Sequence, residues 1–505
     1  MKFVKDKSST IVWFRHDLRL VGNPALSAAI DLGNVISVFI FSQTEEGDWP
    51  PGGASKWWLH QSLEALAKSL EKLGAKLTLR RGDTLKEMQS LVRETGATAI
   101  FWNRRYEPFA IEQERKIEKH FQPAGIETQS FNSHLLFEPW TVVNKSGRPF
   151  RIFTPFWKTC LALAAQKEIS APLPAPRSLP SAKRWPKSLR LGELELEPKI
   201  KWAGGIRAAW EPGEAGAQKK LKKFLRESFS DYGDARNRPD IIGTSRLSPH
   251  LHFGEISPRQ IWHAVQKRSA GFQPASGESA RSVPPNTRRL EACAPINAPI
   301  KYLAEIGWRE FAHHLLFHFP HTPTEPLQEK FKKFSWQKNP AWLKAWQRGQ
   351  TGYPIVDAGM RELWTTGWMH NRVRMLVASF LVKDLLLPWS SGARWFWNTL
   401  VDADLANNTL GWQWVAGCGA DAAPFFRIFN PIMQGEKFDP RGDYVRRWIP
   451  EIANLPDKWI QQPWNAPPEI LSKAGVEPGK NYPKPIVSHT IAREVALEAF
   501  QKLKS

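Results

Sequence analysis

Short apolar runs separated by amphipathic stretches organise the first third of the chain. The runs that look like buried strands cover residues 11–14, 35–41, 76–79 and 99–102. Between them, apolar residues recur at helical spacing over residues 55–73 and 84–95. Strand and helix alternate as in βαβ units, so the pattern predicts a doubly wound parallel-sheet α/β domain. No GxGxxG motif follows the first run, which argues against a standard dinucleotide site there.

Helical periodicity replaces this pattern in the second half of the chain. The change follows residues 171–198, where six prolines interrupt any regular element. We therefore expect an α/β domain (1–139), a proline-rich interdomain linker (140–211) and an all-α domain (212–505). Within the last part, residues 269–299 are rich in Pro, Ser, Ala and Gly and lack apolar periodicity. They are predicted to form a disordered surface insertion.

Two of the predicted helices place charged and aromatic residues on one face. The first, which begins near residue 301, carries at helical spacing Glu305, Trp308 and Arg309. The second is predicted to run unbroken over residues 363–386, and one half-buried stripe along it contains Trp368, Arg372 and Met375. Both faces are compatible either with a surface ion pair beside a core tryptophan or with the wall of a binding site.

The stretch from residue 402 to residue 427 is too polar for a core helix and too aromatic for a solvent loop. Asp402 and Asp404 would repel each other if both were buried and ionised, so they require nearby cations or hydrogen-bond donors. Trp412 and Trp414 add large π surfaces, a lining that suits a planar polar ligand. An ordinary pair of helices with buried aspartate caps is an equally good interpretation of this stretch alone.

The amino-acid composition indicates the class of binding partner and the cellular compartment. The net charge of +21 favours an anionic partner, most often nucleic acid, although some proteins are merely basic. The three cysteines are scattered and form neither a disulfide framework nor a metal cluster, which fits a reducing cytoplasm. No run approaches 18 apolar residues and the first ten residues lack an apolar signal core, so we expect a cytoplasmic protein without a membrane anchor.

Several motifs in order resemble the photolyase/cryptochrome family, closest to class I and class III photolyases of cyclobutane pyrimidine dimers. They are WFRHDLRL (13–20), GTSRLSP (243–249), WREF (308–311), TGYPIVDAGMREL (351–363), TGWMHNRVRM (366–375), DADLANNTLGWQW (402–414) and DAAPFFRIFNPIMQGEKFD (421–439). The resemblance implies an antenna-type α/β domain and an all-α domain that holds FAD in a folded, U-shaped form.

The same resemblance implies roles for individual residues. Those that would contact FAD are Tyr232, Thr244, Ser245, Arg246, Leu247, Ser248, Tyr302, Glu305, Trp368, Asn371, Arg374, Asp402, Asp404 and Asn408. Within this set, the loop 244–248 would hold the phosphates, Arg374 and Asp402 would form an ion pair beside the isoalloxazine, and Asn408 would face its N5. A chain of tryptophans that passes electrons from the surface to the photoexcited flavin would consist of Trp412, Trp389 and Trp336.

The pocket residues favour repair over sensing. Those that resemble the dimer pocket of DNA photolyases are Glu305, Trp308, Met375 and Trp414, and those expected to meet phosphates around the lesion are Arg309 and Arg372. The implied reaction is blue or near-UV light-driven electron transfer from reduced FAD to a dimer flipped out of UV-damaged DNA, a carbon–carbon lyase reaction. We expect Asn408 and Glu305 to take part in it.

Other functions remain as alternatives. WNRRYEP (102–108) and GRPF (147–150) look like plant cryptochromes, which are photoreceptors, and like the related class III photolyases. Against a sensor, no long polar tail follows the helical domain. A 6-4 photolyase is disfavoured because the pocket lacks that group's histidine pattern. A basic DNA-binding protein with a vestigial flavin site is disfavoured because no flavin motif is broken.

The antenna chromophore is the least defined of the expected partners. Residues 106–110 depart from the Asn-Glu pair of some folate-binding photolyases. We expect 5,10-methenyltetrahydrofolate at a class III-like site, with a deazaflavin as the alternative. A monomer is expected.

Overall fold

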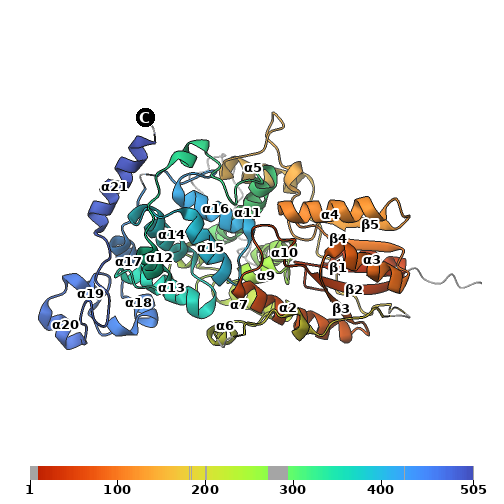
Figure 1. Cartoon of the computed structure of the whole chain (residues 1–505), viewed down its shortest axis with the longest axis horizontal. Helices are drawn as coiled ribbons and strands as arrows, with labels where there is room; N and C mark the ends of the chain where they lie inside the picture. Colours follow the sequence, from red (N-terminus) through yellow and green to blue (C-terminus); the bar gives the residue numbers. More distant parts are fainter. Residues whose placement is uncertain are drawn as a thin grey trace, which may run out of the picture.

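A five-stranded parallel sheet forms the N-terminal part, and the rest of the protein is helical (Figure 1). The computed structural model describes residues 9–503 except 181, 183–184, 200–201, 271–293 and 426. The strand order is β3-β2-β1-β4-β5, and the strands are β1 (Ser9–Phe14), β2 (Asn34–Phe41), β3 (Leu77–Arg81), β4 (Ala99–Asn103) and β5 (Glu127–Phe131). The parallel pairing confirms the fold class predicted for this part.

Helices cover both faces of this sheet because alternate residues of the central strand point in opposite directions. On β1, Val12 and Phe14 enter one core cluster, and Ile11 and Trp13 enter another. The first cluster is closed by α1 (Pro24–Leu32) and α2 (Gly53–Glu71), and the second by α3 (Thr84–Thr95) and α4 (Pro108–Phe121). The α2 and α3 helices match the predictions to within two residues, whereas α4 and β5 were not predicted.

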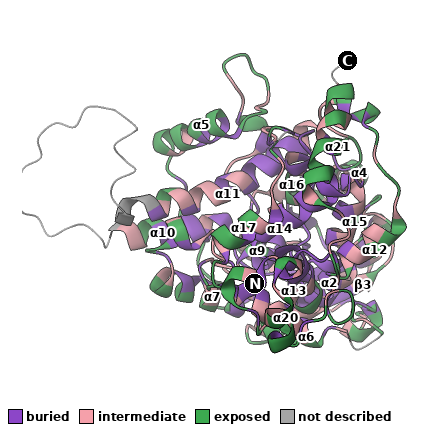
Figure 2. Cartoon of the chain, turned by 90° about the vertical axis from the view of Figure 1, so that its left-hand side faces the viewer, coloured by how far each residue is buried: buried purple, intermediate pink, exposed green. Residues whose placement is uncertain are grey.

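The helical part packs around a third and larger core. Its helices, with the short helices of the connecting segments, are η1 (Pro139–Thr141), α5 (Phe153–Gln166), η2 (Leu191–Leu194), α6 (Gly204–Ala209), α7 (Glu214–Glu227), α8 (Tyr232–Ala235), α9 (Ser248–His252), α10 (Pro258–Ala270), α11 (Ala294–His318), η4 (Glu329–Lys333), α12 (Pro340–Gln347), α13 (Pro354–Thr366), α14 (Asn371–Ser379), η5 (Phe380–Asp384), α15 (Trp389–Thr399), α16 (Leu405–Ala416), α17 (Pro431–Phe438), α18 (Asp443–Trp448), η6 (Pro450–Ile452), α19 (Asp457–Ile460), η7 (Pro463–Asn465), α20 (Pro468–Ala474) and α21 (His489–Lys502). Buried residues concentrate around α14 and α16, whereas α5, α7 and α21 show exposed outer faces (Figure 2).

The single helix predicted over residues 363–386 is wrong. Gly367 ends α13 in the left-handed region (φ +68°), and its N–H donates to the Leu363 carbonyl at 2.8 Å, as a C-terminal glycine cap does. The next helix, α14, begins only after Trp368 and His370, and it passes into the π-helical turn η5. Trp368 therefore lies in a turn and not on a helical stripe.

The sheet and the helical part share one apolar core. The cluster below one face of the sheet contains Phe14 and Trp58 together with Trp210, Phe253 and Trp368. The segment between the two parts also follows the sheet closely, since the N–H of Val35 donates to the Pro180 carbonyl at 2.9 Å. The insertion predicted over 269–299 falls mostly outside the described residues, between the end of α10 and the beginning of α11. No described helix combines the length and apolar character needed to cross a bilayer.

Candidate active site

A cavity of about 600 Å³ opens among α11, α14, α16 and the loop before α9, a volume in the range of small-molecule sites. Nearly all of the residues predicted to touch a cofactor or a substrate line it: Tyr232, Thr244, Ser245, Arg246, Leu247, Ser248, Tyr302, Glu305, Trp308, Arg309, Trp368, Asn371, Arg372, Arg374, Met375, Asp402, Asp404, Asn408, Trp412 and Trp414. Trp389 and Trp336 lie outside the cavity wall, in or against the large helical core.

The predicted ion pair between Arg374 and Asp402 is confirmed. Arg374, on α14, places Nη2 at 2.8 Å from Oδ2 and 3.1 Å from Oδ1 of Asp402. Its Nε also donates to the Met369 carbonyl at 2.8 Å, which fixes the plane of the guanidinium. The Asp402 carboxylate is buried, and this cation supplies the compensation that the sequence required.

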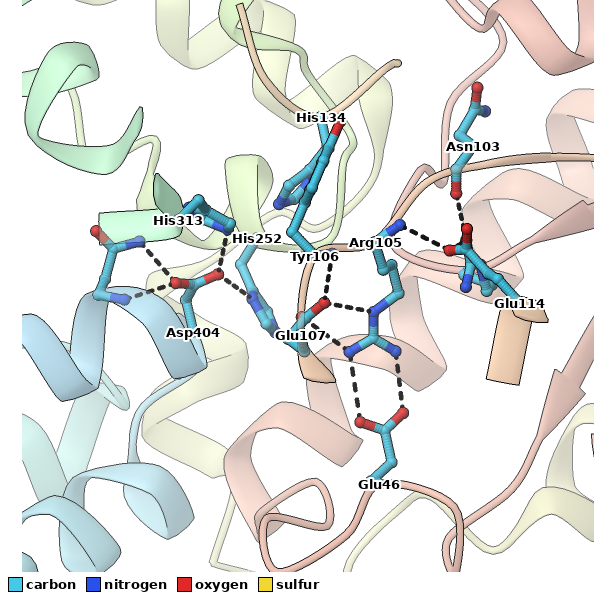
Figure 3. A network of polar contacts seen from close by, with 12 residues as sticks. Glu46, Asn103, Arg105, Tyr106, Glu107, Glu114, His134, His252, His313 and Asp404 are labelled. Atoms are coloured by element: carbon cyan, nitrogen blue, oxygen red, sulfur yellow. Dashed lines mark hydrogen bonds and ion pairs between the residues drawn. The ribbon is translucent and has the colours of Figure 1, made fainter. Parts of the chain in front are cut away.

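Asp404 caps α16 and faces two histidines (Figure 3). Its Oδ1 accepts hydrogen bonds from the backbone and side-chain nitrogens of Asn407, at 2.8 and 2.7 Å. Its Oδ2 lies 3.5 Å from Nδ1 of His252 and 3.6 Å from Nε2 of His313. Burial raises the pKa of Asp404, but His313, His252 and Arg309 outweigh burial and hold the pKa well below the usual value. The cavity therefore has an anionic group on this wall at neutral pH.

These histidines were missed by the sequence analysis. They come from α9 and α11 and meet Asp404 only in the folded chain, so no spacing in the sequence signals them. Together with His134, two of these residues form a group that could hold a metal ion, His134, His313 and Asp404. However, Nε2 of His134 lies 2.6 Å from Nη2 of Arg309, so a guanidinium occupies that ligand position.

An ion-pair network extends from this wall into the sheet domain (Figure 3). Arg105 lies 3.0 Å from both Glu46 and Glu107. Burial raises the pKa of Glu107, but Arg105 outweighs it and lowers the pKa overall. Tyr106 donates its hydroxyl hydrogen to Glu138 at 2.8 Å. Both Tyr106 and Glu107 are buried and face the protein interior.

The expectation that Arg309 meets a DNA phosphate is wrong. Arg309 is buried, and its Nη1 donates to the His134 carbonyl at 2.8 Å. The face of α11 that carries Arg309 packs towards the sheet domain, so this guanidinium supports the inner wall of the cavity and not the protein surface. Arg372 differs, because it is only half-buried and donates to Oδ1 of Asn237 at 2.6 Å.

The predicted dimer pocket contains Arg236, a cation that was not among the predicted site residues. Glu305 pairs with Arg236, with Oε1 at 2.6 Å from Nη2, and both side chains are partly exposed. Trp308, also half-buried, stacks on Phe153 with ring centroids 3.8 Å apart. A carboxylate held by a guanidinium beside indole faces can accept and stack a flat polar group.

Trp412 is held in a tightly packed position. Its ring lies edge-on to Phe396 at 5.0 Å and to Trp346 at 6.2 Å. A Cβ added to Gly392 would lie 2.0 Å from the Trp412 ring, so only glycine fits there. Trp412 and Trp389 are buried and Trp336 is half-exposed.

The residues present fit a flavin dinucleotide. Hydroxyls and the Arg246 guanidinium gather on the loop 244–248, and Arg246 adopts a left-handed conformation (φ +50°). This set of donors suits a diphosphate. The Arg374–Asp402 pair and Asn408 suit the polar edge of a ring system, and Trp368 adds aromatic surface.

Comparisons with known proteins agree with this geometry. Residues 10–177 match the family model described as DNA photolyase, and residues 302–502 match the FAD binding domain of DNA photolyase. The deoxyribodipyrimidine photo-lyase of Agrobacterium fabrum is 49% identical over 98% of both chains. Cryptochrome-2 of Arabidopsis thaliana is 41% identical over 99% of this chain and 80% of its own. The crystal structure of a bacterial class III photolyase from Agrobacterium tumefaciens superposes with a TM-score of 0.91 at 47% identity, covering all of both chains.

Proposed function

Because this chain belongs to the DNA photolyase family, we propose that it is a light-dependent photolyase that splits cyclobutane pyrimidine dimers in UV-damaged DNA. The observation that carries the proposal is the cavity, which brings a flavin-type ion pair and a dimer-type pocket to one place. FAD, when bound, supplies the light-excited electron that opens the dimer.

The chain's own residues would hold and orient that cofactor. The loop 244–248 would bind the diphosphate, and Arg374 would face the ring edge at which negative charge gathers. The amide nitrogen of Asn408 donates to the Ala393 carbonyl at 3.1 Å, which sets the orientation of the amide beside the expected N5 position. No side chain needs to act as a nucleophile.

The dimer would enter from the side of Glu305 and Trp308. Enzymes that act on extruded bases recover the cost of unstacking by stacking them on aromatic side chains, which contributes about 1–3 kcal/mol per base. Trp308 and Trp414 offer those faces, Met375 adds an apolar contact, and Arg372 is placed to meet a phosphate. The net charge of +21 supports DNA binding through release of counterions.

One assay tests this proposal. Purified protein with reduced FAD is mixed with an oligonucleotide that contains a thymine dimer, and the dimer is quantified after illumination and after the same time in the dark. We expect loss of the dimer only in the light. Persistence of the dimer with fully loaded, reduced protein would refute the repair function.

The second candidate is a cryptochrome-type photoreceptor, favoured by the 41% identity to a plant cryptochrome. A photoreceptor would change conformation in light without opening the dimer. Limited proteolysis in light and dark, on the same preparation used for the repair assay, separates the two functions.

Further parts of the proposal concern partners and organisation. We propose a monomer in the cytoplasm, with 5,10-methenyltetrahydrofolate or a deazaflavin as antenna, and domains divided at residues 139 and 211. Light scattering tests the mass. Extraction of the purified protein, followed by fluorescence and mass spectrometry, identifies the second chromophore.

A further inference from the structure

A second series of tryptophans leaves the cavity in the direction of the sheet domain. It begins at Trp368 on the cavity wall, whose ring lies 6.4 Å from Trp210. Trp210 lies 5.3 Å from Trp58, and Trp58 lies 6.3 Å from its neighbour Trp57 on α2. All four rings are buried and meet edge to face.

Judged by ring distances alone, this series could supply electrons to the flavin as well as Trp412 does. Rings whose centroids lie 5–7 Å apart are in or near van der Waals contact, and electrons tunnel readily across such distances. Trp368 and Trp412 both line the cavity. Contact between rings therefore does not explain why one of the two would donate and the other would not.

Charge does distinguish the two series. Over Trp368 lies the Arg246 guanidinium, with its Cζ 4.6 Å from the ring centroid. Over Trp210 lies the Lys220 ammonium at 4.5 Å, and over Trp57 lies the Arg207 guanidinium at 5.7 Å. Among the described residues, no cation lies over the rings of Trp412, Trp389 or Trp336.

A cation above an indole is attracted to the neutral ring but repels the positive charge that oxidation leaves there. Arg374 also lies over Trp368, at 5.9 Å, but its charge is compensated by Asp402. The Arg207 charge is compensated in the same way, because its Nη2 lies 3.0 Å from Oε1 of Glu197, and the Arg246 charge would be compensated by the FAD diphosphate. Lys220 makes no ion pair within 4 Å in the described part of the chain, because Glu211, the carboxylate that raises its pKa, pairs with Lys219 at 2.7 Å. Burial lowers the pKa of Lys220 to about 8, and the ammonium still carries its charge at neutral pH.

We infer that Lys220 hinders oxidation of Trp210, so that electrons do not pass along the Trp368–Trp210–Trp58–Trp57 series and the flavin is supplied through Trp412. Trp58 differs, because its Nε1 donates to Glu255 at 3.0 Å, a contact that favours its oxidation. The ring whose oxidation is hindered is therefore Trp210. This inference rests on the proposed photochemistry, in which one electron leaves an indole, the flavin gains it, and a thiol reductant in solution restores the indole.

The test uses the FAD-loaded Trp412→Phe variant, in which the main route is blocked. Blue light is applied without oxygen in the presence of dithiothreitol, and two signals are followed: loss of the oxidised-flavin absorbance and the transient absorbance of a tryptophan radical. We expect that adding Lys220→Gln raises the rate by at least about tenfold, the effect of removing a unit charge 4.5 Å from the Trp210 ring. A further Trp210→Phe should remove the gain.

Matched variants separate charge from structural damage. Lys219→Gln replaces Lys220→Gln as the control, because Lys219 lies next to it on α7 and pairs with Glu211 at 2.7 Å. Lys220→Gln leaves the phosphate-binding loop intact, and Lys219→Gln should give no gain. No gain from Lys220→Gln, at equal FAD occupancy, would overturn the inference.

This test and the repair assay can fail independently of each other. Failure to open dimers would refute repair but leave both photoreduction signals measurable. If Trp412→Phe reduces its flavin as fast as the parent and Trp210→Phe then slows it, the second series is already open and the inference fails.

Discussion

Substituting Gly392 by alanine should displace Trp412 and destabilise the helical part. Gly392 lies within α15, where alanine normally gains about 1 kcal/mol of helix propensity. The added Cβ, however, would lie 2.0 and 2.5 Å from two atoms of the Trp412 ring and 2.6 Å from Leu381. Those separations are more than 1 Å inside contact distance, so the ring must move. Overpacking of this kind costs about 1–3 kcal/mol, so after the gain in helix propensity we expect a net loss of up to about 2 kcal/mol.

The assay is unfolding in denaturant, followed by far-UV circular dichroism, with a matched control in the same fold. Gly411 lies in α16 and has nothing within 4 Å of an added Cβ, so Gly411→Ala should be neutral or stabilising by up to about 1 kcal/mol. Combining Gly392→Ala with Trp412→Phe removes the ring atoms that clash and should recover part of the loss. If Gly392→Ala is as stable as Gly411→Ala, or if Trp412→Phe gives no relief, the packing of Trp412 is not as described.

Four further predictions follow from other contacts. Asp402→Asn leaves the Arg374 guanidinium without its partner and should cost about 3 kcal/mol in denaturant unfolding and weaken FAD retention; unchanged values for both would contradict the role of the pair. Glu305→Ala should lower dimer repair at least about tenfold, the loss expected when polar groups in a built pocket lose their partner, while FAD stays bound; full repair would remove Glu305 from the pocket. Burial raises the pKa of Glu310 to about 7, so the neutral carboxyl stabilises the fold below about pH 4.5, and this contribution is lost as the pH rises to about 7. The fall in Tm between these two pH values should therefore be smaller in Glu310→Gln than in the parent protein. An identical fall in both proteins would contradict the assignment. Deleting residues 271–293, which stops short of α11, should leave folding and flavin content intact, and a colourless product would show that the insertion is structural.

Sequence periodicity predicted the elements that have an apolar signal and missed those without one. The α3 helix was predicted to the residue from its amphipathic spacing, and the structure shows that Asp83 caps it and Gly96 ends it. In contrast, β5 was missed because its sequence, ETQSF, is polar and its residues are half-exposed at the sheet edge. The break at Gly367 had a signal, a glycine before an aromatic residue, but the long apolar pattern on either side concealed it.

In the candidate site, too, some contacts could be predicted from the sequence and others could not. The Arg374–Asp402 pair was expected because Asp402 and Asp404 required a nearby cation and the family resemblance pointed to Arg374. The contacts of Asp404 with His252 and His313 depend on three separate elements, and only the tertiary fold brings these residues together. Arg309 was misplaced because a polar helix face that packs on a second domain has the same pattern as one that faces water.

The apolar cluster shared by Phe14, Trp58, Phe253 and Trp368 makes each half of the chain depend on the other for folding. A fragment cut at the proline-rich segment would present several large aromatic rings to water, and such a surface drives aggregation. Neither half is therefore an independent module that recombination could exchange freely.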